Sequence, residues 1–241
     1  MSDHLIRQLI LRDRSLTPAS RHRLNSGFGP STTVPAGEDF VAKGSRPKHC
    51  TVVVSGWACS YDTLPDGRRQ ITAFHISGDF VDLQSFRLKR MDQGVGAISD
   101  CRIATLSHAA ILDITETDPH LARLLWLSSL VDAAVLRQWL LSSGQRSALE
   151  HAAHLLCELF TRLRGVGMAA PGESFELPLS HADFAAALGI STVHVSRTLS
   201  ELRTLNLFQW RGREAQILDW EGLQRVANFD PAYLMLSDDP R

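Results

Sequence analysis

Cysteine is scarce in this sequence, and no disulfide pattern is present. The four cysteines lie far apart and include no Cys-x-x-Cys pair: Cys50, Cys59, Cys101 and Cys157. Small secreted domains that depend on disulfides carry their cysteines at high density. The pattern therefore argues against a disulfide scaffold and predicts free thiols in a reducing cytoplasm.

Long apolar runs and targeting segments are also missing. The N-terminal stretch MSDHLIRQLILRDRS has neither an uninterrupted apolar core nor a cleavage site of small residues, so we expect no signal peptide. No apolar run approaches the length that is needed to span a bilayer. We therefore expect no membrane partner.

An excess of charge of one sign is likewise lacking. The chain has 25 lysines and arginines against 26 aspartates and glutamates, with 44% apolar and 21% charged residues. This composition is typical of a globular protein, and 241 residues suffice for one large domain or two small ones. The balanced charge neither indicates nor excludes nucleic acid as a partner, because one face of a neutral protein can be basic.

The first part of the chain, from about Thr33 to Ser107, has the pattern of short β-strands. The segments VVVSGWACSY and QITAFHI flank LPDGRR, in which Pro65, Asp66 and Gly67 favour a bend. Many short strands with regular turn signals predict a sandwich or a barrel. We expect this effector-type domain over residues 1–117.

A long helix is predicted from Asp118 to Ser143. Asp118 suits the N-cap, Pro119 the first turn and Gly144 the C-terminal end. Its apolar residues cover more than one side, and because a barrel covers only one, the other side needs a partner. We expect residues 118–144 to pair two copies of the chain, through Leu124, Leu127, Val131 and Val135. The alternative is a wholly internal core helix.

The region after Leu179 has the spacing of a helix-turn-helix. Ser180 and Asp183 are spaced as a capping box at the start of the short helix ADFAAAL. Gly189 permits the positive backbone angle of a tight turn, and Ser191 is placed to cap a second helix.

This second helix has two distinct faces at about 100° per residue. The packing side carries Val195, Thr198, Leu199 and Leu202, and the other carries Val193, Ser196, Arg197 and Ser200, with Thr192 and His194 at the margins. Short hydroxyl side chains let a helix approach a DNA groove closely, Arg197 has the length to take a guanine edge, and Val193 suits a thymine methyl. An ordinary solvated face would carry glutamate and lysine, whereas Arg197 alone is charged at the centre of this face. We therefore predict DNA recognition.

The segment from Leu207 to Leu218 alternates around Gly212 and predicts a β-hairpin, the wing of a winged helix. Arg211 and Arg213 at its tip are placed to contact backbone phosphates, which position a protein without reading sequence. A merely solvated turn is the alternative for this pair. We expect the winged helix-turn-helix domain over residues 145–241.

The order of barrel, long helix and winged helix resembles the cyclic-AMP receptor protein and FNR (Crp-Fnr) family of bacterial transcription regulators. The resemblance covers nearly the whole chain. Its most specific segments are GISTVHVSRTLSELR, GDF at Gly78 to Phe80, and LPDGRRQITAFHISGDFVDL, which are similar to an α-proteobacterial branch whose signals are mostly undefined.

The resemblance implies an α+β protein with a cyclic-nucleotide-binding-like jelly-roll barrel, a dimerisation helix and a C-terminal winged helix-turn-helix. It implies a homodimer on a palindromic DNA operator, with RNA polymerase as a further candidate partner. By the same resemblance, Ser180 and His181 meet phosphate, and the base-reading positions are Thr192, Val193 and Arg197. The expected DNA-contacting set is completed by Ser191, His194, Ser196 and Arg213.

The sequence departs from the family in the effector domain. Members that bind cyclic nucleotides carry Gly-Glu-Leu, followed about ten residues later by Arg-Ser or Arg-Ala, and that arginine pairs with the cyclic phosphate. Here GDF continues as VDLQS without a glutamate, and Met91-Asp92 stands near the arginine position. The candidate effector-pocket residues are Asp82, Lys89 and Arg90. Two alternatives remain open. One is a regulator gated by a cyclic nucleotide or another ligand through a non-standard pocket, and the other is a ligand-independent DNA-binding protein.

No cofactor, metal or catalytic site is predicted. The region before Cys50 has no cysteine cluster for an iron–sulfur centre. His75 and His108 are possible haem ligands, but strand and surface histidines are commoner. His151, His154 and Cys157 share one helix without a fourth ligand, so we expect helix packing with half-exposed histidines. Phosphate loops, nucleophile elbows and acid–base constellations are missing, so we expect no enzyme.

Cyclic AMP is expected neither to bind tightly nor to raise the affinity for DNA. A cyclic phosphate carries one negative charge and needs a fixed fork of donors, which arginine supplies and Met91-Asp92 does not. Titration calorimetry with cyclic AMP and cyclic GMP, beside DNA binding with and without each nucleotide, tests this expectation. Micromolar binding with a matching gain in DNA affinity would contradict it and point to Lys89 or Arg90 as the replacement phosphate ligand.

Overall fold

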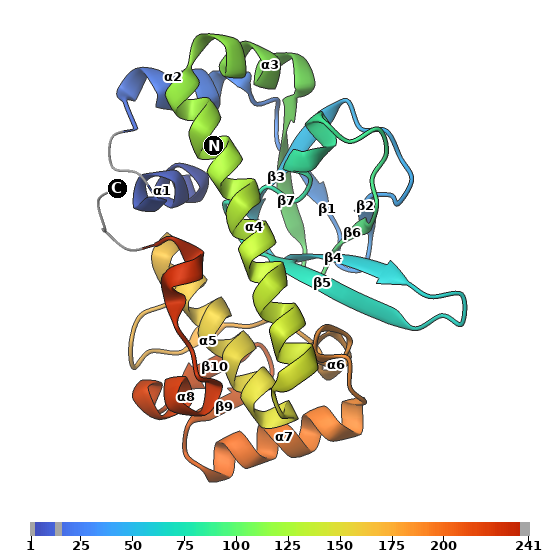
Figure 1. Ribbon diagram of the computed structural model, residues 1–241, viewed down its shortest axis with the longest axis vertical. Helices are drawn as coiled ribbons and strands as arrows, with labels where there is room; N and C mark the ends of the chain where they lie inside the picture. The colour runs from blue at the N-terminus through green and yellow to red at the C-terminus, as the bar shows by residue number, and fades with distance from the viewer. Residues whose placement is uncertain (1–2, 13–15, 237–241) are drawn as a thin grey trace. The chain divides into compact units, whose positions relative to one another are not determined.

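The computed structural model describes residues 3–12 and 16–236, which divide into two compact units (Figure 1). The first unit contains the described chain up to Arg68 together with Thr72–Asp132. The second contains Arg69–Ile71 and Ala133–Leu236. The first unit is rich in strands and the second is mostly helical, which confirms the mixed α and β architecture.

Two sheets form the barrel-like part of the first unit. Their strand orders are β1-β7-β3 and β2-β6-β4-β5. The strands are β1 (Thr32–Val34), β2 (Asp39–Val41), β3 (His49–Ser55), β4 (Ala58–Thr63), β5 (Arg69–His75), β6 (Gly94–Ala97) and β7 (Cys101–Ser107). Buried side chains from both sheets, including Val53, Val95 and Ile103, share one apolar core. This shared core confirms the predicted sandwich or barrel.

The segment VVVSGWACSY forms two strands with a break at Gly56. Gly56 has a φ of +92°, and a Cβ atom at this position would lie 2.4 Å from the Asp100 carbonyl oxygen. Only glycine fits there without a shift, because L side chains rarely adopt this conformation. The predicted turn in LPDGRR is confirmed between β4 and β5, where Gly67 has a φ of +85° and donates its amide to the Leu64 carbonyl.

Three helices that the sequence pattern did not predict pack on the barrel: α1 (Asp3–Arg12), α2 (Pro18–Gly27) and α3 (His108–Thr117). Leu9 of α1, Leu24 of α2 and Ile111 of α3 lie in one buried cluster with Leu106 of β7. Thr17 begins α2, since its side chain accepts the Ser20 amide. These helices extend the apolar core beyond the two sheets.

The long helix α4 spans Pro119–Gln145. Asp118 accepts the Leu121 amide through Oδ1 at 3.0 Å, so the predicted N-cap is present. The prediction that Gly144 ends the helix is wrong, because α4 continues through it to Gln145. The chain turns instead at Ser147, which forms a capping box with Glu150 at the start of α5 (Ala148–Val166).

α4 also corrects the expectation about apolar length. By length and composition it is long and apolar enough to cross a membrane. The sequence contains no uninterrupted run of that length because Arg123, Asp132 and Arg137 lie within the helix. These charges are few among many apolar residues, so the mean hydropathy of the helix is still high. The core helix of a protein meets the same criterion, and α4 contributes Leu121 and Leu125 to the buried cluster of the first unit.

The second unit packs the C-terminal part of α4, four further helices and a short 3₁₀ helix, η2, with a sheet of order β8-β10-β9. After α5 its elements are β8 (Phe175–Glu176), α6 (His181–Leu188), α7 (Thr192–Thr204), β9 (Phe208–Arg211), β10 (Glu214–Ile217), α8 (Trp220–Ala227) and η2 (Pro231–Leu234). The hairpin predicted around Gly212 is the pair β9 and β10, in which Arg211 lies opposite Glu214. The third strand, β8, was not predicted.

A buried carboxylate joins three helical elements of the second unit. Glu158 of α5 is fully buried and accepts hydrogen bonds from Trp139 Nε1 of α4 at 3.1 Å and from the Tyr233 hydroxyl of η2 at 2.9 Å. Burial raises the pKa of the Glu158 carboxyl, while the Arg162 guanidinium, 3.5 Å away, acts in the opposite direction. Because a buried polar group is costly when it loses a partner, these bonds hold α4, α5 and η2 in one arrangement.

We expect Gly56→Ala to lower the free energy of unfolding more than Gly67→Ala. Both glycines have positive φ angles, which cost an L residue about 1–2 kcal/mol. Only Gly56 adds a backbone clash, since nothing lies within 4 Å of a Cβ atom placed at Gly67. Urea unfolding followed by circular dichroism measures both variants, and equal midpoints would contradict the expected role of the Asp100 contact.

Candidate nucleic-acid interface

The helix-turn-helix is built from three local caps. Ser180 Oγ accepts the Asp183 amide at 3.1 Å and the Asp183 carboxylate accepts the Ser180 amide at 2.9 Å, so the predicted capping box begins α6. Gly189 ends α6 with a φ of +69°. Ser191 Oγ then accepts the His194 amide at 3.2 Å and begins α7. Each predicted cap is confirmed.

The two faces of α7 are separated as the sequence predicts. Val195, Thr198, Leu199 and Leu202 are buried. The exposed residues are Thr192, Val193, His194, Ser196, Arg197 and Ser200, with Ser191 exposed at the cap. Val193 is 60% exposed, which leaves its apolar side chain available to a partner. The DNA-contacting role of these residues stays a prediction.

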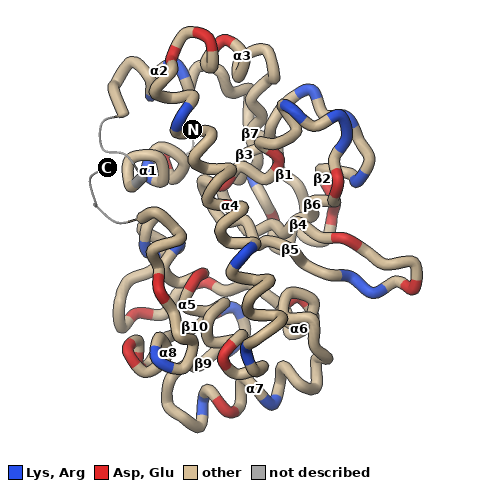
Figure 2. The backbone as a smooth tube through the Cα atoms, viewed as in Figure 1, with Lys and Arg blue, Asp and Glu red and all other residues tan. Residues whose placement is uncertain are grey.

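The exposed side of α7 carries unpaired positive charge. Arg197 and Arg203 form no ion pair with any residue in the described ranges, and Figure 2 shows basic and acidic positions along α7. Glu201 lies about 160° from Arg203 around the helix, and only about 40° from Arg197, with which it forms no ion pair. The guanidinium groups are therefore free to meet phosphate or base edges.

The two wing arginines differ in their surroundings. Arg213 forms an ion pair with Glu176 of β8, with 2.7 Å between Nη2 and Oε1. Arg211 forms no ion pair within the described part of the chain and is exposed. Arg213 would have to share or exchange Glu176 in order to bind a phosphate. The contact of either arginine with a phosphate stays a prediction.

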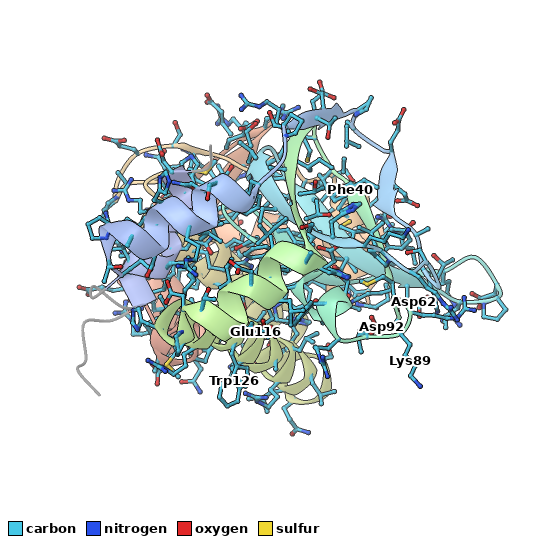
Figure 3. All side chains as sticks on the ribbon, turned by 90° about the horizontal axis from the view of Figure 1, so that it is seen from above. Phe40, Asp62, Lys89, Asp92, Glu116 and Trp126 are labelled. Atoms are coloured by element: carbon cyan, nitrogen blue, oxygen red, sulfur yellow. The ribbon has the colours of Figure 1, made fainter. Side chains whose placement is uncertain are left out.

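The side chains of the three candidate effector residues, Asp82, Lys89 and Arg90, form no hydrogen bond or ion pair with one another in the described part of the chain. Asp82 precedes the short helix η1 (Leu83–Phe86), is fully buried and accepts the Thr51 amide, and burial raises its pKa to about 7. Arg90 donates to the Gly44 carbonyl at 3.1 Å. Lys89 is exposed and extends away from the protein (Figure 3). A non-standard pocket formed by these three residues stays a prediction.

The cysteines are free and buried, as predicted for the thiol state. Burial raises the pKa of Cys50 to about 12 and that of Cys101 to about 11, which leaves little thiolate at neutral pH. Cys59 is fully buried as well. Burial therefore disfavours oxidation of Cys59 or Cys101 as a signal, and the raised pKa of Cys101 disfavours its oxidation further.

The histidines of α5 are packed more deeply than expected. His151 and His154 are buried rather than half-exposed, and His154 contacts the rings of Phe229 and Tyr233. Burial lowers the pKa of His154 to about 3 and that of His151 to about 4, so both are neutral at physiological pH. Within the described residues, no group of three His, Cys, Asp or Glu side chains is arranged to hold a metal ion.

Two family models match two separate parts of the chain. The cyclic nucleotide-binding domain model matches residues 31–118, and the Crp-like helix-turn-helix domain model matches residues 150–226. The nitrogen fixation regulation protein FixK of Rhizobium meliloti is 28% identical over 212 residues, which cover 88% of this chain and 90% of that protein. FixK of Azorhizobium caulinodans is 32% identical over 166 residues, which cover 69% of this chain and 64% of that protein.

A solved structure supports the same assignment. The structure of FixK2 from Bradyrhizobium japonicum matches with a TM-score of 0.74 and 27% identity, and the match covers 82% of this chain and 96% of that one. A barrel, a long helix and a winged helix-turn-helix define a DNA-binding transcription regulator. We call the exposed side of α7 around Val193 and Arg197 its reading face. This chain belongs to the Crp-Fnr family of such regulators, and its relatives are of the α-proteobacterial type. The resemblance noted in the sequence is confirmed.

We expect Arg197→Ala to reduce sequence discrimination by about 1–3 kcal/mol per half-site, because an arginine at the centre of the reading face can bind a guanine edge with two hydrogen bonds. The measurement compares binding to a selected specific duplex and to a random duplex at one fixed salt concentration. An equal loss on both duplexes would identify Arg197 as a phosphate contact and contradict the prediction.

Proposed function

We propose that this protein acts in the cytoplasm as a homodimer that binds a two-fold symmetric operator, with α7 of each protomer in one major groove. The observation that carries the proposal is the exposed face of α7, where Arg197 stands unpaired among short polar side chains. Residues 145–241 form the proposed DNA-binding domain. The family contains transcription regulators rather than enzymes, and no catalytic activity is proposed.

The proposed dimer uses the exposed face of α4. Trp126 is 65% exposed, Leu130 48% and Leu140 74%, and the spacing of these residues places them within about 80° of one another around the helix. Figure 3 shows Trp126 extending outward from α4. Exposed aromatic and leucine side chains in one stripe are typical of a surface that a partner covers. A second copy of α4 is the proposed partner because symmetric pairing buries the same stripe on both chains.

This face differs from the one that the sequence pattern selected. Leu124, Val131 and Val135 are buried within a single chain, and Leu127 is half-buried. A side chain that is already buried adds no new apolar contact when a second chain binds. We therefore place the proposed dimer interface at Trp126, Leu130 and Leu140, on the side of the helix opposite Val135.

Control of DNA binding is proposed to be independent of cyclic AMP. Met91 is buried and Asp92 is exposed where the family pattern requires an arginine, so neither offers the donor fork that a cyclic phosphate needs. Either another ligand or a change in protein level then controls the regulator. RNA polymerase is the proposed second partner, since a relative of 26% identity is the transcriptional activator protein FnrL of Cereibacter sphaeroides.

Selection of duplexes from a randomised pool tests the proposed function directly. The expected product is a two-fold symmetric sequence whose half-sites lie about 34–36 Å apart, one turn of the double helix. Footprinting on the selected sequence then shows whether both half-sites are protected. Enrichment of no sequence, or of a single unrepeated half-site, would contradict the proposal.

We expect Leu130→Glu to weaken both dimerisation and operator binding, because a charge in the apolar stripe of α4 must be buried without a partner when two chains meet. Sedimentation measures the oligomeric state. The matched control is Leu112→Glu on α3, where the leucine is 47% exposed and lies outside the stripe. Sedimentation of the unmodified protein as a monomer at micromolar concentration, or equal behaviour of both variants, would rule out this interface.

A further inference from the structure

A small polar cavity lies within the second unit beside the reading face of α7. Its volume is about 240 Å³, and its polar lining comes from His181, Ser196, Ser200 and Arg203. Trp210 of β9 forms part of its apolar wall. The cavity is smaller than the roughly 300–1,000 Å³ of pockets that bury drug-sized ligands. Its size and its lining favour a compact polar group over a nucleotide or a cofactor.

The cavity lies on a second stripe of α7. Ser196, Ser200 and Arg203 follow one another at intervals of four and three residues, so they lie along one side of the helix. Arg197, at the centre of the reading face, is turned by about 100° from Ser196. α7 therefore presents two adjacent stripes, one with Val193 and Arg197 and one with Ser196, Ser200 and Arg203 that faces the cavity.

The charge and hydrogen-bonding groups of the cavity suit an anion. The Arg203 guanidinium and the Ser200 hydroxyl have no protein partner in the described part of the chain. His181 Nδ1 lies 3.3 Å from Ser196 Oγ, and the His181 ring meets the edge of Trp210. His181 is also the first residue of α6, whose free amides add positive potential. The Asp183 carboxylate in the same turn accepts the amide and hydroxyl of Ser180 and keeps its negative charge, which offsets part of this potential, so the Arg203 guanidinium supplies the positive charge of the cavity.

We propose that this cavity binds one backbone phosphate of the DNA duplex. Its donors are Ser200, which the sequence pattern placed on the DNA-facing side of the helix, and Arg203, which neither the sequence pattern nor the family resemblance indicated. The proposal rests on the proposed function, in which α7 enters a major groove. A helix about 10–12 Å across fills a groove about 12 Å wide, so the flank of the helix faces the phosphates at the groove wall. A phosphate held there fixes the depth and rotation of α7 without reading sequence.

The test measures the salt dependence of binding for Arg203→Gln. Loss of one phosphate contact per protomer lowers the slope of log affinity against log salt concentration by about 0.9, or about 1.8 for a dimer. We expect equal loss of affinity on the selected and the random duplex. The matched control is Arg225→Gln on α8, where an exposed arginine of the same unit pairs with Asp219 and Glu221 instead of lining the cavity. The control slope should not change.

Ser200→Glu provides a second test that leaves Arg203 in place. A carboxylate in the cavity repels a phosphate, so affinity for both duplexes should fall by more than it does in Ser200→Ala, with the same thermal unfolding. Wild-type affinity in Ser200→Glu, or an unchanged salt slope in Arg203→Gln, would overturn the proposal. A change in sequence preference without a change in slope would also overturn it and make Arg203 a base contact.

Failure of this proposal and failure of the proposed function give different results. If selection enriches no sequence, the proposed operator recognition fails, but the salt slope on random duplex still tests the cavity because phosphate contacts are independent of sequence. If a symmetric operator is selected and Arg197→Ala loses discrimination while Arg203→Gln behaves as the unmodified protein, the function stands and the cavity proposal falls.

Discussion

The rotation of α7 about its own axis is the constraint on which the reading face depends. Val195 and Leu202 are fully buried and Leu199 nearly so, and a helix with one buried stripe cannot turn without exposing it. The caps at Ser180 and Ser191 fix where α6 and α7 begin, and Gly189 sets the angle between them. As a result, Val193 and Arg197 face outward together, and Ser196, Ser200 and Arg203 face the cavity beside them.

This arrangement gives the exposed side of α7 two kinds of chemistry. The reading stripe offers few but specific groups, and the neighbouring stripe offers hydroxyl and guanidinium donors that suit any phosphate. In the proposed complex, affinity and specificity are contributed by different residues of the same helix. The two arginines of the wing also differ from each other, because Arg213 forms an ion pair with Glu176 while Arg211 is unpaired within the described residues.

Within the second unit, a polar contact holds the end of α4 to α5 and η2 in addition to apolar packing. Glu158 receives hydrogen bonds from Trp139 and Tyr233, and burial makes the loss of either donor costly. Any ligand that alters DNA binding must favour one arrangement of α4 and the winged domain over another.

The sequence by itself determined the elements whose signals are local. The caps at Asp118, Ser180 and Ser191, the turn at Gly67 and the division of α7 into two faces all depend on residues within a few positions of one another, and the structure confirms each. Tertiary structure decided which side of α4 is exposed, because its apolar residues surround the helix and only the packing of the rest of the chain selects Trp126 over Val131. It likewise brought His181 and Trp210 beside Ser200 and Arg203, and Glu158 beside Tyr233, since no local pattern links residues that far apart in the chain.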